Sequence, residues 1–440
     1  MRDFTQEDKH KAEAVARGWE ILDRIRKNWE LTKNEGIRHP LIRSSVVPWH
    51  PLSLEAGDLG LCLIYSSADR FDPDGQWDSL AHKHASVAFD YFCNTSDLNI
   101  GLFSGASGLA FALTSLSREG RRYKNALKFI NETLILKTRA LISNLNPNQG
   151  IPTDSYDMVN GLSGVAWYIL HRSTLYGGAI KSSEDSRLEK LLEDILEEFK
   201  RRASLLPYLK MGFFTDSTQI TNVEQAYYGH LKSGYINVGF AHGLAGVLAV
   251  LGEAKKQGWR GLSDSILRIR STLNRSIVYT KYGPDTDYYI YPQSNGRYQE
   301  FTRSAWCYGN PGLAIAVNLS VPSHPDTLPS AKSLIASCIK RPSSIQQIDN
   351  PSLCHGYSGL LLSSANLGVS DDKSLDKILL NWNASRTYGL DVEHSQDYCV
   401  DSPGVLEGSG GAAVALLHIG EYGDIDSPVR LQLFGRRSAC

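Results

Sequence analysis

Two cysteines and a histidine carry the clearest chemical signal in the sequence. Cys307 lies in the segment AWCYGNPG, and Cys354 and His355 are adjacent in LCHGYSG. Two thiolates and one imidazole suit zinc, and three protein ligands leave the fourth tetrahedral position open for water or substrate. These residue types predict a catalytic zinc site. The alternative is two unrelated buried cysteines.

The charge of such a site indicates which reactions it could catalyse. Two protein thiolates cancel the double positive charge of zinc, so an incoming third thiolate makes the centre anionic and keeps its sulfur nucleophilic. A free cysteine thiol, with a pKa of about 8.5, is mostly protonated at neutral pH, and metal binding removes that proton. The predicted site is therefore suited to activating a substrate thiol.

Three more polar residues are candidates for the same site. His242, in FAHGLAG, is a candidate proton donor or base, although a lone histidine also has a structural interpretation. Asp157 lies four residues before Gly161 and Arg303 four before Cys307, so each could orient or charge-balance the site. Asp157 could equally be a helix N-cap.

Repeated helical hairpins must position these residues. The pattern Gly-x-x-Gly, followed by an apolar segment, begins at seven places: Gly57, Gly105, Gly161, Gly243, Gly309, Gly356 and Gly408. The apolar segments, such as LAFAL and VLAVL, predict helices buried on every side, and amphipathic segments between them predict outer helices. Stacked hairpins of this kind can close into a ring. We expect an all-α fold, a seven-fold α/α toroid of inner and outer helices, as a single domain over residues 1–440.

The glycines would place their neighbours along a common rim. They could be packing devices only, but the residues just before the first glycines are mostly polar: Ala56, Ser104, Asn160, His242, Tyr308, His355 and Glu407. Cys307 and Cys354 occupy equivalent places one residue earlier. Residues remote in sequence could therefore converge on one end of the ring.

Two stretches interrupt the repeat, at about 204–240 and 277–299. Both are aromatic and β-branched, which predicts small β or irregular insertions. Tyr288, Tyr289 and Tyr291 could bind a peptide, but packing at the surface is the favoured interpretation.

Composition excludes several classes of function. The 46 Lys and Arg against 47 Asp and Glu give a net charge of −1, which argues against non-specific nucleic-acid binding. No signal peptide, apolar run of membrane-spanning length, P-loop or dinucleotide fingerprint is found, so we expect a cytoplasmic protein. Seven cysteines, an odd number, are too few for a disulfide framework.

The motifs together resemble those of the lanthionine synthetase C family, the cyclases of lanthipeptide (lantibiotic) biosynthesis. The likeness spans about residues 55–417 and is carried by DMVNGLSG at 157–164, AHGLAG at 241–246, RSAWCYGNPG at 303–312 and CHGYSG at 354–359. The first repeat departs from the family pattern, with Ala56 where a histidine is often found.

This resemblance implies an α/α toroid with Zn2+ on Cys307, Cys354 and His355. It also implies that the insertions at about 204–240 and 277–299 bind a peptide. It also implies that His242 is the acid/base histidine and Asp157 its acidic companion. Active-site neighbours would then be Arg303, Trp306 and Tyr308.

The implied reaction is addition of precursor-peptide cysteine thiols to dehydroalanine or dehydrobutyrine, which forms lanthionine or methyllanthionine thioether rings. The partners would be a dehydrated precursor with leader and core, a separate dehydratase and an exporter, in a complex that could hold the protein at the membrane. Two alternatives stay open. The enzyme could instead add glutathione to dehydrated residues, or the protein could be a non-enzymatic peptide-binding toroid.

Overall fold

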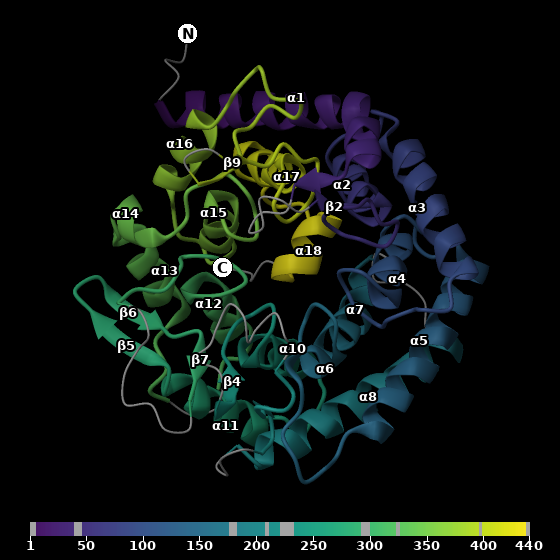
Figure 1. Ribbon diagram of the computed structural model, residues 1–440, viewed down its shortest axis with the longest axis vertical. Coiled ribbons are helices and arrows are strands. Elements are labelled where there is room, and N and C mark those ends of the chain that lie inside the picture. The colour runs from purple at the N-terminus through teal and green to yellow at the C-terminus, as the bar shows by residue number, and fades with distance from the viewer. Residues whose placement is uncertain are drawn as a thin grey trace. The chain divides into compact units, whose positions relative to one another are not determined.

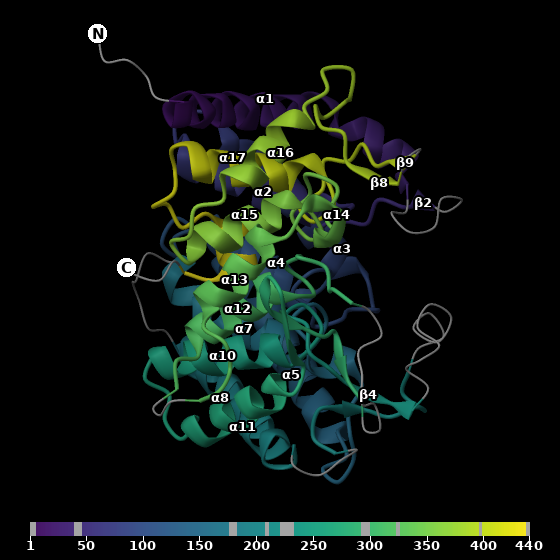
Figure 2. The same cartoon turned by 90° about the vertical axis from the view of Figure 1, so that its left-hand side faces the viewer.

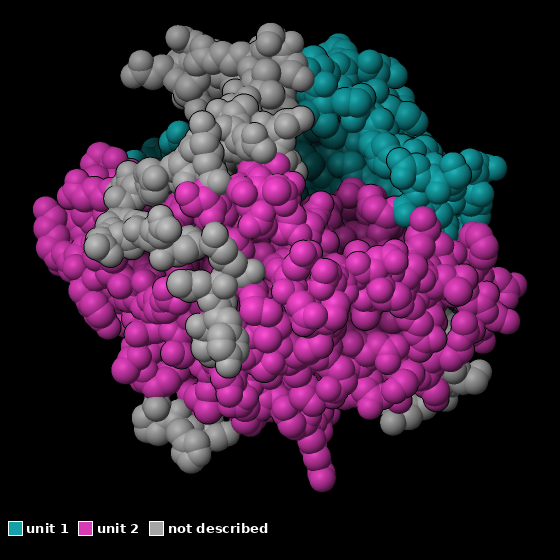
Figure 3. Space-filling model, turned by 60° about the horizontal axis from the view of Figure 1, so that its bottom comes forward, with its two compact units in different colours: residues 1–98, 111–123, 347–440 teal, residues 99–110, 124–346 magenta. Residues whose placement is uncertain are grey.

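The computed structural model covers the 440-residue chain and describes residues 6–38, 46–175, 183–206, 211–220, 233–291, 300–322, 326–395 and 398–436. Its contacts divide the chain into two compact units (Figure 3). Unit 1 comprises residues 1–98, 111–123 and 347–440, and unit 2 comprises residues 99–110 and 124–346. The two units are described separately below.

Each Gly-x-x-Gly motif opens an apolar helix, as the sequence predicts. These inner helices are α2 (Asp58–Phe71), α4 (Ala106–Ser115), α7 (Leu162–Leu175), α10 (Leu244–Lys256), α12 (Asn310–Leu319), α15 (Tyr357–Asn366) and α17 (Ser409–Gly420). In α10 every residue from Leu244 to Ala254 is buried, because its sequence has no polar face.

Amphipathic helices alternate with the inner ones along the chain. They are α3 (Trp77–Asn94), α5 (Lys124–Asn144), α8 (Ser183–Ser204), α11 (Ser263–Asn274), α13 (Ala331–Lys340) and α16 (Asp372–Leu380). In α8 the predicted apolar stripe is buried, from Leu188 through Ile195 to Phe199. The shorter helices are α6 (Thr153–Tyr156), α14 (Ser343–Gln346) and α18 (Pro428–Phe434).

In unit 1 the outer partner of the last inner helix comes from the opposite end of the chain. The long helix α1 (Gln6–Glu35) packs along α17 and also contacts α16, as Figures 1 and 2 both show. Helix α17 also contacts α2 and α15, and α18 packs on α2. The N-terminal segment thus completes the seventh hairpin.

In unit 2 consecutive inner helices pack side by side. Helix α10 contacts both α7 and α12, while α8 packs against α5, α7 and α11. The outer helix α13 packs on α12 and on the hairpin strand β6 (Gly283–Thr286).

Short strands fill parts of the two predicted insertions. Strands β3 (Phe214–Thr215), β4 (Tyr235–Asn237) and β7 (Tyr289–Ile290) form an antiparallel sheet in that order, and β5 (Ile277–Thr280) pairs with β6. Residues 207–210, 221–232 and 292–299 of the insertions lie outside the described residues. Two further antiparallel pairs are β1 (Ile37–Arg38) with β2 (Val46–Val47), and β8 (Glu393–Ser395) with β9 (Tyr398–Cys399).

The motif glycines are required by close backbone approach. A Cβ on the second glycine would lie 1.9 to 2.5 Å from the carbonyl oxygen six residues earlier at Gly60, Gly164, Gly246, Gly312 and Gly411. A Cβ on Gly309 would lie 1.9 Å from the Arg303 carbonyl oxygen. Gly309 also has φ +112°, a backbone conformation that favours glycine. The glycines therefore have a packing role, because each allows an inner helix to start against an earlier turn.

Backbone hydrogen bonds join the turns before successive inner helices, here called rim turns. In unit 2, Leu102 N–H donates to the Val159 carbonyl at 2.8 Å, and Phe240 N–H to the Cys307 carbonyl at 3.0 Å. In unit 1, Cys354 N–H donates to the Leu406 carbonyl at 2.8 Å. Neighbouring repeats are thus held together at the level of the candidate residues.

None of the described helices is both long and apolar enough to cross a membrane.

Candidate active site

The His242 and Asp157 side chains form a direct pair in unit 2. His242 Nδ1 lies 2.6 Å from Asp157 Oδ2. The carboxylate is fully buried, whereas the imidazole is 35% exposed. With Nδ1–H donating to the carboxylate, the lone pair and proton exchange of the ring are left to Nε2.

Asp157 is not the N-cap of α7, which begins at Leu162, but its side chain does hold the turn before that helix. Its other oxygen, Oδ1, accepts the backbone N–H of Asn160 at 2.6 Å and of Gly161 at 2.9 Å, in the turn before α7. Met158 N–H meanwhile donates to the Ala241 carbonyl at 3.0 Å, which ties the two rim turns together. One carboxylate therefore satisfies the turn and orients the histidine of the next repeat.

Tyr308 lies beside this pair. Its ring stacks near His242, with centroids 6.1 Å apart and planes at 27°, and its hydroxyl accepts a hydrogen bond from Asn237 Nδ2 at 2.9 Å. Burial raises the pKa of the Tyr308 hydroxyl above its ordinary value, so the hydroxyl stays protonated and can donate.

Arg303 and Trp306 belong to the same rim turn. The backbone N–H of Arg303 donates to the Tyr288 hydroxyl at 2.7 Å. Trp306 is fully buried and packs between the rings of Phe103 and Phe240, with centroid separations of 6.0 and 5.4 Å. Trp306 therefore supports the turn as part of the core.

Cys307 is buried just before the glycine that opens α12. Its carbonyl accepts the N–H groups of Phe240 and Ala241, at 3.0 and 3.2 Å, which fixes the backbone of this turn against that of His242. At the start of this turn, the buried Asp285 carboxylate accepts two hydrogen bonds from Thr302, one from the backbone N–H at 3.1 Å and one from the hydroxyl at 2.6 Å. Strand β6 thus anchors the beginning of the turn that ends at Cys307.

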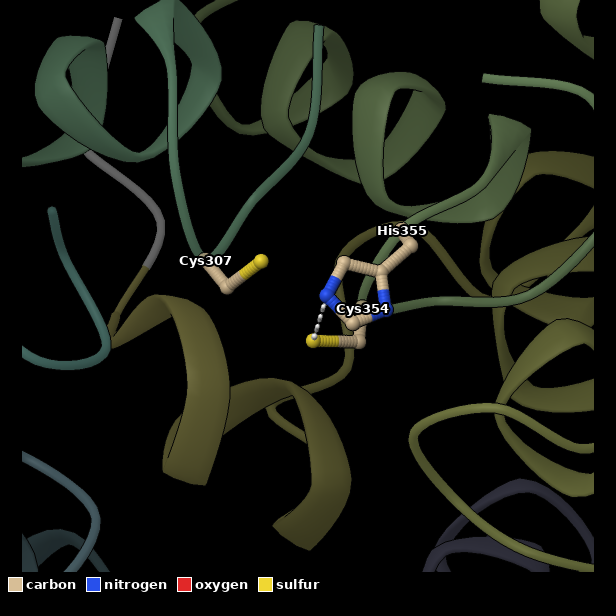
Figure 4. Close-up of side chains that lie close together, drawn as sticks. All are labelled: Cys307, Cys354 and His355. Atoms are coloured by element: carbon tan, nitrogen blue, oxygen red, sulfur yellow. Dashed lines mark hydrogen bonds between the residues drawn. The ribbon is translucent and has the colours of Figure 1, made fainter. Parts of the chain in front are cut away.

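Cys354 and His355 lie in the turn before α15 in unit 1, where adjacent side chains can face each other. Cys354 Sγ lies 3.7 Å from His355 Nε2 (Figure 4). Two tetrahedral zinc ligands, a thiolate at about 2.3 Å and an imidazole at about 2.1 Å, are about 3.6 Å apart. The observed separation therefore fits two ligands of one zinc ion.

The other ring nitrogen of His355 is paired with a carboxylate. Nδ1 contacts Glu407 Oε1, and the Glu407 side chain is only 10% exposed. A second carboxylate, Glu55, accepts the backbone N–H groups of Leu406 and Glu407 at 2.8 and 2.9 Å. Burial raises the pKa of Glu55 to about 7.

Sequence reasoning did not select Glu407, Glu55 or Asn237 as candidates. A usable signal existed for Glu407, because it occupies in its repeat the position that His355 occupies in the preceding one. No such signal marks Asn237, whose contact with Tyr308 depends on strand β4.

The remaining described cysteines have simpler environments. Cys62 and Cys338 are buried, Cys93 is exposed, and all three are free. Cys62 lies within the apolar inner helix α2, where it is part of the core.

Comparison with known proteins identifies the family. The family model described as lanthionine synthetase C-like protein matches residues 48–427. The chain belongs to the lanthionine synthetase C-like family. It is 25% identical over 382 residues to the nisin biosynthesis protein NisC of Lactococcus lactis subsp. lactis, covering 83% of this chain and 84% of that one. A solved structure of nisin cyclase matches with a TM-score of 0.69 at 20% identity, covering 94% of this chain and 97% of that one.

These matches confirm three predictions made from the sequence. They are the family, the all-α toroid fold class and the class of enzyme, a lanthionine-synthetase-type cyclase. The roles of individual site residues and the single-domain organisation stay predictions.

Proposed function

We propose that this lanthionine-synthetase-type enzyme is a zinc-dependent lanthipeptide cyclase that joins cysteine thiols of a precursor peptide to its dehydroalanine or dehydrobutyrine residues. Family membership and the likeness to a nisin biosynthesis protein support the reaction class. The observation that carries the proposal is the Cys354 and His355 donor pair, whose 3.7 Å separation suits one zinc ion.

In this proposal Cys307, Cys354 and His355 are the zinc ligands. Within the described part of the chain, these are the residues that together could hold a metal ion, and Figure 4 draws them. When bound, zinc would bind the substrate thiol, favour its deprotonation and keep its sulfur nucleophilic.

The reaction forms one carbon–sulfur bond and breaks one carbon–carbon π bond. The substrate thiolate attacks the β-carbon of the dehydro residue, and the π electrons move toward the adjoining carbonyl as an enolate. His242 then delivers a proton to the α-carbon, which balances the proton lost from the thiol.

The neighbours of His242 prepare it for this step. Asp157 holds Nδ1, so that Nε2 is the nitrogen that exchanges protons with the substrate. The Tyr308 ring lies beside the imidazole, and burial keeps its hydroxyl protonated. Arg303, in the same turn as Cys307, is our candidate for the positive charge that stabilises a developing enolate.

The substrate and setting follow from this chemistry. The chain would act in the cytoplasm on a dehydrated precursor, so a separate dehydratase must supply the dehydroalanine and dehydrobutyrine groups. The exporter and any membrane-bound complex belong to the same proposal. The insertion residues Tyr288 and Tyr289 lie near Tyr308, and Tyr291 lies near Tyr289; these three tyrosines are our candidates for peptide contact.

The proposal is tested with a synthetic peptide that carries one dehydroalanine and one cysteine. Ring closure leaves the peptide mass unchanged and removes the thiol that an alkylating reagent would modify. We expect the purified chain to abolish alkylation, with free glutathione present as a competing thiol. Glutathione adducts without rings would contradict the cyclase proposal in favour of glutathione addition, and an unchanged peptide would favour a binding protein.

A further inference from the structure

Two histidines at equivalent repeat positions share one arrangement. His242 Nδ1 is held by Asp157 from the preceding repeat, and His355 Nδ1 is held by Glu407 from the following one. In both cases the carboxylate is almost fully buried, while about a third of the imidazole is exposed. The structure therefore commits the same ring nitrogen of each histidine to a carboxylate.

The Glu407 carboxylate is itself fixed to the turn that carries the metal-ligand candidates. Its Oε2 accepts the Ser352 hydroxyl at 3.5 Å. The carbonyl of the preceding Leu406 accepts the N–H groups of Leu353 and Cys354, at 3.0 and 2.8 Å. The side chain and the backbone of the seventh rim turn thus hold the sixth, which contains Cys354.

Glu55 fixes the segment from the other side. Its carboxylate accepts the N–H groups of Leu406 and Glu407, and its Oε1 accepts the Ser402 hydroxyl at 3.3 Å. These contacts lie within unit 1 and use three successive repeats, the sixth, the seventh and the first. Glu407 therefore has little freedom to move away from His355.

We infer that Glu407 is a positioning residue for the metal ligand His355, with Glu55 holding Glu407 in place; this inference rests on the proposed zinc site. The carboxylate accepts Nδ1–H, which selects the tautomer whose Nε2 lone pair faces Cys354 Sγ. It also makes the imidazole a better donor. Loss of such a partner typically weakens metal binding about 10- to 100-fold.

The experiment measures Zn2+ affinity of the metal-depleted full chain by competition with a chromophoric chelator. Variants are Glu407→Gln, which keeps the shape of the side chain, and Glu407→Ala, which removes the contact. We expect affinity to fall about 10- to 100-fold in both. We also expect the visible absorption bands of the Co2+ complex to shift, because the ligand field of His355 changes.

Asp157→Asn is the matched control. It alters the same kind of contact on His242, which is not among the proposed ligands, so Zn2+ affinity and the Co2+ spectrum should stay as in the wild type. Circular dichroism of the metal-free proteins reports whether each variant folds. If Glu407→Ala does not fold, the isosteric Glu407→Gln still decides the question.

The outcomes distinguish failure of the Glu407 positioning role from failure of the proposed zinc site. A wild-type chain that binds Zn2+, together with Glu407 variants of unchanged affinity and Co2+ spectrum, would overturn the positioning role alone. A wild-type chain that binds no Zn2+ would overturn the proposed zinc site and the positioning role with it.

Discussion

At the scale of residues, the candidate acid/base histidine differs from the candidate zinc ligand in the surroundings of its Nε2 atom. His242 Nε2 belongs to a ring that is 35% exposed, with the Tyr308 ring beside it. His355 Nε2 instead faces a cysteine sulfur at 3.7 Å. A histidine at this repeat position can therefore exchange protons in one turn, and a histidine at the equivalent position can serve as a metal ligand in another.

Replacing His242 separates these two functions. We expect His242→Ala to keep its zinc and to slow ring closure about 10²- to 10⁴-fold, because the α-carbon loses its proton donor. The measurement is the rate of thiol loss in the synthetic peptide, with zinc content determined on the same sample.

His82→Ala is the control for that variant, because His82 is exposed and hydrogen-bonded to Tyr123 away from the candidate site. It should close rings at the wild-type rate. Wild-type kinetics in His242→Ala would remove the acid/base assignment.

Glu55 makes a separate contribution to stability that depends on pH. Its pKa is raised by burial from 4.5 to about 7, so between these values the folded protein holds a proton that the unfolded chain releases. The free energy of unfolding should therefore fall as pH rises through this window, on the order of 3 kcal/mol for this group.

Glu55→Gln removes the titrating group and should remove that part of the pH dependence. Denaturant unfolding of wild type and variant, at about pH 5 and about pH 8, measures it. An equal difference between the two proteins at both pH values would show that Glu55 does not titrate in this window.

At the scale of elements, the rim turns are the structures that place the chemistry. Each ends at a glycine that allows an inner helix to start against the carbonyl of an earlier residue. Gly309 is the most demanding, since it combines φ +112° with a Cβ position 1.9 Å from the Arg303 carbonyl, two residues after Cys307. A side chain there must move the Cys307 turn.

Gly309→Ala and Gly258→Ala form a matched pair of substitutions. Gly258 has φ +94° but open space around its Cβ position. We expect Gly258→Ala to cost about 1 kcal/mol from backbone strain alone, and Gly309→Ala to cost at least about 2 kcal/mol more and to lower zinc content. Denaturant unfolding with metal analysis checks both, and equal losses would contradict the close-approach argument.

The start of each inner helix was predictable because its signal is local. Gly243 is followed at once by an apolar run, and α10 begins at Leu244. The role of α1 as the outer partner of α17 was not predictable, because that pairing joins the two ends of the chain. The small strands of the insertions were expected, but not that β6 would anchor the turn before Cys307.

At the scale of the whole molecule, the proposed active site depends on residues from several repeats. Cys307 and Cys354 belong to consecutive repeats, and so do Asp157 and His242. Repeat equivalence predicted which residues should lie at the rim. It could not predict partner choice, such as Glu407 with His355, because side-chain contacts between repeats depend on the folded chain.

Zinc content and ring closure of Cys354→Ala, measured together on the purified chain, test the central claim most directly. We predict one zinc ion per wild-type chain and, in the variant, loss of zinc and of ring closure with helical circular dichroism retained. Ring closure at the wild-type rate by the zinc-depleted variant would contradict the proposed mechanism.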